Sequence, residues 1–241
     1  MKDKIENHLS SISQISLFLD LDQDDLKKIL KNAHIWHYKA EEIIFSKDEK
    51  ILNFSIILEG SVKLFLTNLE GKESIIKIAD FGDSLSNFFS DIFSTNAKAI
   101  EDVTVLTFAL NKFKELTKEN NILLLNILLY TSLQNQDLTK QISQLKLGNT
   151  KENLGEFLLK NSFKKGYKTK DFNLKFDKAT IASYLGMRPE TLSRTLQKLQ
   201  NDGEININKN KITLPERNSL CQYCNNEIAA KCSNHDSDFC K

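Results

Sequence analysis

The chain has 241 residues, a hydrophobic share of 40% and a net charge of +1, a length that allows one large domain or two compact ones with a buried core. Its densest apolar stretch, 122–130, is interrupted by Asn126 and is too short to cross a bilayer. Because the first ten residues also lack the apolar region of a secretory signal, we expect a cytoplasmic protein with no membrane partner. Residues 146–217 carry 15 Lys and Arg against 8 Asp and Glu, a balance of +7 that leaves −6 for the remainder. Such a segment suits either an ordinary solvated surface or a polyanion such as nucleic acid.

Short runs rich in Ile, Val and Phe predict antiparallel strands between about residues 38 and 110. Turn residues separate the runs, as in Glu59-Gly60 and Phe81-Gly82-Asp83. An amphipathic helix is predicted before them, in DQDDLKKILKNA. Many short strands at regular spacing indicate a sandwich or a barrel.

The next segment, 111–147, contains neither Gly nor Pro and predicts a long helix. Its apolar residues recur at helical spacing, and a helix between two domains must bury such residues against something. Packing within one subunit and pairing with a second copy across a two-fold axis are both open. For the second possibility, the expected dimer seam consists of Leu125, Leu129, Leu133, Leu138 and Ile142.

The clearest motif is FDKATIASYLGMRPETLSRTLQKLQNDG, which begins at Phe176. Asp177 suits a helix N-cap, Gly186 a sharp turn between helices, and Pro189 the first position of a second helix. In that second helix Leu192, Leu196 and Leu199 form a stripe that is expected to be buried. The opposite face carries Glu190, Ser193, Arg194 and Gln197, whose donors and acceptors suit base edges in the major groove of DNA. The pattern predicts a helix-turn-helix followed by a hairpin, or wing, around Lys209.

From Thr180 to Leu214 the chain resembles the helix-turn-helix and wing of the Crp/Fnr transcription regulators, and EGSVKLFL with GKESIIKIADFGD resembles their β-roll. The resemblance implies an α+β fold with an antiparallel, cyclic-nucleotide-binding-like β-roll in 1–118, a dimerisation helix in 119–148 and a winged helix-turn-helix in 149–220. It also implies a homodimer that acts with RNA polymerase.

The resemblance extends to the half-site. Glu190, Ser193 and Arg194 match the Glu-x-x-Ser-Arg pattern of the Fnr-like branch, which implies a palindrome with TTGAT-like half-sites. Pro189 stands where the cAMP-responsive branch carries an arginine.

Cyclic-nucleotide-binding members pair the ligand's phosphate with an arginine. Here Lys98 is the only cation between Gly82 and Leu110, which argues against such a ligand, because a buried phosphate needs a paired cation.

All four cysteines lie in the tail 221–241, as Cys221-x2-Cys224-x7-Cys232-x7-Cys240. The resemblance is to family members with a C-terminal cysteine cluster, and it implies a [4Fe–4S] cluster bound by these four residues. Zinc, including a site of three cysteines and His235, and a thiol switch remain open. The sequence contains no phosphate loop, HExxH or nucleophile motif of an enzyme. We therefore expect a redox- or oxygen-responsive regulator; the alternative is a regulator with a small effector in the β-roll and a structural zinc or thiol tail.

Overall fold

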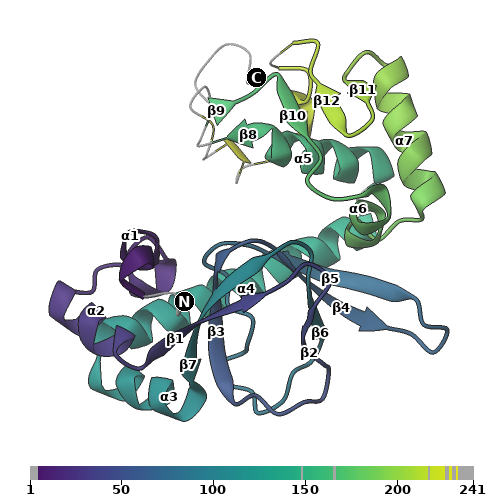
Figure 1. The fold of residues 1–241 in the computed structure, drawn as a ribbon. Helices are drawn as coiled ribbons and strands as arrows, with labels where there is room; N and C mark the ends of the chain where they lie inside the picture. The colour runs from purple at the N-terminus through teal and green to yellow at the C-terminus, as the bar shows by residue number, and fades with distance from the viewer. Residues whose placement is uncertain are drawn as a thin grey trace. The chain divides into compact units, whose positions relative to one another are not determined.

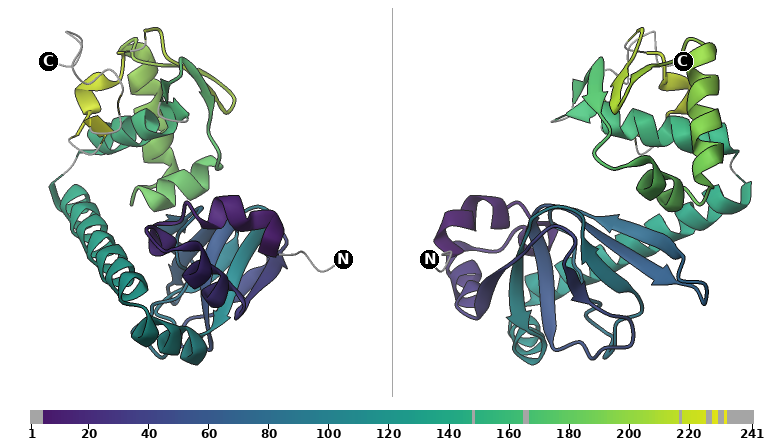
Figure 2. Two further views of the ribbon diagram at one scale, coloured as in Figure 1. Left: turned by 90° about the vertical axis from the view of Figure 1, so that its left-hand side faces the viewer. Right: turned by 45° about the vertical axis from the view of Figure 1, so that its right-hand side comes forward.

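The computed structural model describes residues 5–147, 149–164, 167–216, 218–225, 228–229 and 232. The chain forms two compact units, Met1–Leu138 and Thr139–Lys241 (Figures 1 and 2). The first unit contains a β-roll and the second a winged helix, which confirms the predicted α+β class. Within the described residues, no helix has the length and apolar character needed to span a bilayer.

Short helices open the first unit. They are η1 Ile5–His8, α1 Leu9–Ile12, η2 Ser16–Phe18 and α2 Gln23–Leu30. Asp22 caps α2 by accepting a hydrogen bond from the Asp25 amide at 2.7 Å, so the helix predicted before the strands is confirmed.

Seven strands in two antiparallel sheets form the β-roll. They are β1 Ala33–Tyr38, β2 Ile43–Phe45, β3 Asn53–Glu59, β4 Val62–Thr67, β5 Glu73–Ala79, β6 Asn96–Ala99 and β7 Val103–Ala109. One sheet has the order β1-β7-β3 and the other β2-β6-β4-β5. The interior strands β7, β6 and β4 each pair on two sides, and β7 is buried along six of its seven residues.

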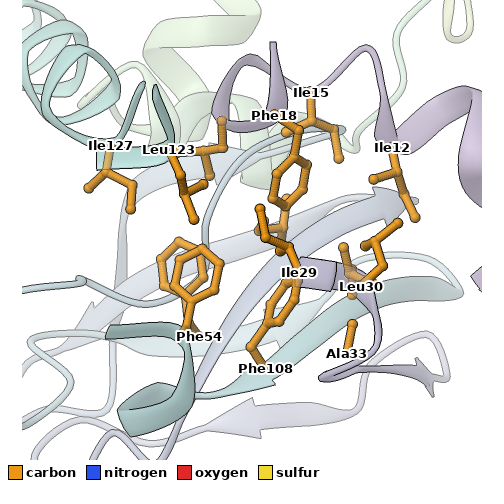
Figure 3. Close-up of a cluster of buried hydrophobic side chains, with 14 of the residues drawn as sticks. Ile12, Ile15, Phe18, Ile29, Leu30, Ala33, Phe54, Phe108, Leu123 and Ile127 are labelled. Atoms are coloured by element: carbon orange, nitrogen blue, oxygen red, sulfur yellow. The ribbon is translucent and has the colours of Figure 1, made fainter. Parts of the chain in front are cut away.

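A cluster of aromatic and aliphatic side chains packs beneath the first sheet (Figure 3). Phe54 of β3 stacks on Phe113 with ring centroids 4.5 Å apart, and Phe108 of β7 lies in the same cluster. Leu123 and Ile127, at the start of the long helix, are at most 1% exposed within it. The long helix therefore begins as part of the β-roll core.

The helical segment predicted for 111–147 is two helices, α3 Leu110–Glu119 and α4 Asn121–Leu147. Asn120 breaks it with an extended backbone, and its side chain accepts from the Leu123 amide at 2.9 Å. Its amide group also donates to Asp25 at 2.6 Å. The predicted long helix is therefore α4, and the helical stretch is interrupted once because this asparagine caps α4 and is held by a residue 95 positions earlier.

The second unit contains a three-helix and hairpin arrangement. Its elements are α5 Thr150–Ser162, β8 Phe163–Lys164, β9 Tyr167–Lys168, β10 Asp171–Asn173, α6 Lys178–Tyr184, α7 Pro189–Asn201, β11 Asn206–Asn208, β12 Lys211–Thr213 and η3 Cys221–Tyr223. The sheet order is β10-β12-β11. Leu154 and Leu158 of α5 share a core with the apolar side of α7 and with Leu220, which places the first residues of the tail on this unit.

Two turn glycines of the β-roll offer a matched test. Gly60 and Gly71 both have a positive φ, of 85° and 78° respectively. A Cβ added to Gly60 would overlap the Asp102 carbonyl oxygen, whereas a Cβ added to Gly71 would meet no atom within 4 Å. We expect Gly71→Ala to cost about 1 kcal/mol of unfolding free energy from backbone strain alone, and Gly60→Ala about 2–4 kcal/mol because the clash adds to the strain. Urea unfolding of both variants measures the difference, and equal losses would contradict the role of the Asp102 contact.

Candidate nucleic-acid interface

The turn between α6 and α7 is built from local interactions. Asp177 caps α6 by accepting from the Thr180 amide at 2.7 Å. Gly186 then takes φ of +65°, and the next amide, that of Met187, donates back to Ala182 at 2.9 Å. This closure ends α6 and turns the chain sharply. Pro189 opens α7 at a position whose amide hydrogen is not needed, so the predicted turn is confirmed.

The packing of α7 determines which of its side chains reach solvent. Leu192, Leu196 and Leu199 are at most 3% exposed. Thr195, which the sequence analysis did not assign, is also buried and donates its hydroxyl to the Thr191 carbonyl at 2.8 Å. The opposite side of the helix is therefore directed away from the core.

The four predicted contact residues of α7 all lie on this outer side, namely Glu190, Ser193, Arg194 and Gln197. The Arg194 Nε lies 3.4 Å from the Glu190 carbonyl oxygen, and the Gln197 amide group donates to Asn201 at 3.0 Å. Arg188, the N-cap of α7, is exposed beside them and was missed by the sequence analysis. Its place next to Pro189 was the available signal, because helix N-termini and nearby cations bind phosphate.

The wing is the β11–β12 hairpin, in which Ile207 pairs with Ile212. Lys209 lies at its turn with φ of +55° and is exposed. The third strand, β10, pairs with β12 through Phe172 and Ile212. The hairpin therefore presents one cation at its tip, as predicted from NKNK.

Lysines of the β-roll are paired with carboxylates. Lys98 lies 2.5 Å from Glu41, Lys77 lies 2.7 Å from Asp83, and Lys63 is paired with Glu73. Lys98 is the cation that the sequence analysis singled out in the ligand segment.

The interior of the β-roll beside this segment is closely packed. Phe93 stacks on Phe45 at a centroid distance of 3.6 Å, and the buried Ser86 hydroxyl accepts from the Ser55 amide at 3.1 Å. Both side chains of this segment, Phe93 and Ser86, thus contact neighbouring strands of the β-roll.

Three of the four predicted metal ligands fall within the described residues. Cys221 and Cys224 stand at the two ends of the turn η3, closed by a 2.9 Å bond from the Cys224 amide to the Cys221 carbonyl. Cys224 is exposed, whereas Cys221 and Cys232 are half-buried. Cys240 lies outside the described residues, as does His235.

A thiolate set of this kind suits iron–sulfur or zinc binding, and one turn brings its first two members together. Among the described residues, no three His, Cys, Asp or Glu side chains converge as a metal-binding group. The described part of the chain therefore does not by itself assemble the ligand set.

A winged helix-turn-helix and a β-roll on the same chain as a long helix define a DNA-binding transcription regulator, not an enzyme. Family comparison agrees: residues 152–223 match the Crp-like helix-turn-helix domain, and residues 35–120 match the cyclic nucleotide-binding domain. The chain belongs to the Crp/Fnr family of regulators and binds DNA through its helix-turn-helix.

Individual relatives extend over most of the chain. The nitrogen fixation regulation protein FixK of Bradyrhizobium diazoefficiens is 29% identical over 210 residues, which cover 80% of this chain and 83% of FixK. The anaerobic regulatory protein of Haemophilus influenzae is 25% identical over 222 residues, 88% of this chain and 85% of that protein. The solved structure of FixK2 from Bradyrhizobium japonicum has a TM-score of 0.71 at 20% identity and covers 80% of this chain and 98% of that chain. This structural likeness establishes the fold.

Proposed function

We propose that the protein is a homodimeric regulator of the Fnr-like branch that reads a palindrome of TTGAT-like half-sites, acts with RNA polymerase and is controlled through its C-terminal cysteines. The observation that carries the DNA-reading part is the outward polar face of α7. The control part rests on the grouping of all four cysteines in the tail and on the similarity to a protein named as an anaerobic regulator.

Each residue of the polar face has a chemistry suited to one part of DNA. Arg194 can donate two hydrogen bonds to a guanine, and Glu190 can accept from the amino group of cytosine. Ser193 and Gln197 complete the base-reading face. Arg188 and Lys209 are assigned to phosphates by their positions, because Arg188 stands at the N-terminus of α7 and Lys209 at the turn of the wing, outside the helix face that carries Arg194.

For DNA reading, Arg194→Ala should cost about 1–3 kcal/mol per half-site and relax the preference at one base pair. Lys209→Ala is the matched control: it also removes one cation, but it should weaken all sequences equally and lower the salt slope by about one. Titration of fluorescent palindromes, each with one symmetric base change, measures both effects. Unchanged affinity of Arg194→Ala for the palindrome would mean that α7 does not read bases.

The long helix α4 carries a second apolar side in addition to the one that packs on the β-roll. The five residues of the predicted dimer seam are 47–63% exposed, which is high for leucine and isoleucine. Leu128 is 48% exposed as well. A solvent-facing row of this kind on a regulator whose family dimerises supports an interface between two copies.

Helix geometry divides the predicted seam into two groups. At about 100° per residue, Leu138 and Ile142 point about half a turn away from Leu125, Leu129 and Leu133. Leu128 and Ile142, in contrast, are two heptads apart and share one core position of the heptad, and Leu138 falls at the other core position between them. These three residues therefore lie on the same side of α4. We propose the Leu128, Leu138 and Ile142 side as the centre of the seam, while Leu125, Leu129 and Leu133 form a second exposed apolar side of α4.

For assembly, Leu138→Glu with Ile142→Glu should give monomers, because a two-fold axis would bring like charges together in a buried seam. Leu125→Glu with Leu129→Glu is the matched pair on the second apolar side. Light scattering gives the mass of each variant. A dimer that persists in the first pair would contradict the proposed seam, and monomers in both pairs would mean that the interface covers both groups.

For sensing, we propose that Cys221, Cys224, Cys232 and Cys240 hold a [4Fe–4S] cluster. Such a cluster would supply an oxygen-sensitive, redox-active centre. The β-roll is the less suitable sensor of an anionic effector, because Lys77 and Lys98 are paired with Asp83 and Glu41 and the ring of Phe93 stacks on Phe45.

Metal analysis of anaerobically purified protein tests this assignment. Each single Cys→Ala change should lower the iron content, whereas His235→Ala should leave it unchanged. Exposure to air should bleach an absorption band at about 400 nm and weaken operator binding. About one zinc per chain and no iron would instead support a structural tail and move sensing to the β-roll. Equal operator affinity before and after air would contradict redox control.

A further inference from the structure

Gly155 occupies an interior position of α5, where glycine is unfavourable by about 0.5–1 kcal/mol relative to alanine. Its backbone torsions are ordinary for a helix, so conformation does not require it. What requires it is the ring of Tyr223: a Cβ on Gly155 would overlap three atoms of that ring. Tyr223 belongs to η3, the turn that begins with Cys221 and lies beside α5 (Figure 2).

The hydroxyl group of Tyr223 ties the same turn to the end of α7. It donates to one Glu204 carboxylate oxygen at 2.6 Å, and Lys151 of α5 donates to the other at 2.6 Å. Lys151 also donates to Asp202, the C-cap of α7, at 2.6 Å. Glu204 lies between the end of α7 and the first wing strand, directly before the buried Ile205.

Lys151 balances the two carboxylates of this network. Its hydrogen bonds to Asp202 and Glu204 raise the pKa of Lys151. The ammonium group of Lys151 therefore stays charged and holds both carboxylates against α5.

A second anchor follows on the other side of Cys224. The Asn225 side chain donates to Glu156 of α5 at 2.6 Å and accepts from the Ile228 amide at 3.0 Å. Ile228 is 4% exposed in the core of this unit. Cys224 is thus held between two residues that are fixed to α5, and Cys221 stands two residues before the first of them.

We infer that Tyr223 is a positioning residue through which the cysteine turn sets the end of α7 and the start of the wing. Any change in the bonding of Cys221 or Cys224 alters the backbone next to Tyr223, and the Glu204 bridge carries that change to the segment that joins the two DNA-contacting elements. The positioning role stands on the contacts alone, whereas its use in signalling rests on the proposed function of the cysteines.

Tyr223→Phe tests the bridge because it keeps the ring and removes only the hydroxyl. Amide exchange in residues 198–208 should rise about tenfold, the effect expected from losing a hydrogen bond to a charged group. Operator affinity should fall several-fold, and the ratio of affinities between anaerobic and air-treated protein should move towards one, with iron content unchanged. Glu204→Gln should act in the same direction. Glu152→Gln, an exposed charge change on the same helix, is the control that should behave as wild type.

Gly155→Ala gives a test that a general loss of stability would not mimic. It should lower the melting temperature in wild type because Cβ displaces the ring. In a Tyr223→Ala background it should raise the melting temperature, because only the helix preference for alanine remains.

The outcomes separate the two proposals. Wild-type exchange and operator affinity in Tyr223→Phe would overturn the positioning role whatever the metal content. Wild-type protein without iron and without a response to air would overturn the redox proposal, while the exchange and affinity changes of Tyr223→Phe would still establish the positioning role.

Discussion

The burial of one leucine stripe on α7 is the constraint on which the DNA-reading surface depends. Leu192, Leu196 and Leu199 are almost fully enclosed, and each such side chain contributes about 1.5–3 kcal/mol when it leaves water. Rotating the helix to present another face would expose all three. The buried leucines therefore determine that Arg194 and its neighbours face outward. The turn at Gly186 determines only where α7 begins.

The long helix α4 serves two packing requirements along its length. Leu123 and Ile127 belong to the β-roll core, and the Tyr130 hydroxyl accepts from the Ser84 amide at 2.8 Å in the segment where relatives of the cyclic-nucleotide type hold their ligand. Ile122, Leu128 and the five residues of the predicted seam are 41–63% exposed. One side of α4 packs on the β-roll and another side is exposed. This arrangement suits a helix that transmits a conformational change in the β-roll to the proposed dimer seam.

The tail and the β-roll differ in how well each suits a sensing role. The β-roll keeps the family architecture, but Lys77 and Lys98 are paired with carboxylates and Phe93 stacks on Phe45. The first part of the tail packs on the DNA-binding unit, with Ile228 in its core and Tyr223 against α5. Ligands attached to residues 221 and 224 would be only a few bonds from the network that ends α7. The proposed control through the cysteines rests on this proximity to the DNA-binding unit.

The sequence by itself determined the elements whose signals are local. The strands, the N-cap Asp177, the Gly186 turn and the buried side of α7 follow from turn chemistry and from periodicities of two and about 3.6 residues. Only the tertiary structure decided the break at Asn120, which is held by Asp25, and the seat of Tyr223 on Gly155, 68 positions earlier. Such contacts depend on which distant surfaces meet, and no local period encodes that. The sequence analysis did not single out Gly155, and only the fold showed that the ring of Tyr223 requires a glycine there.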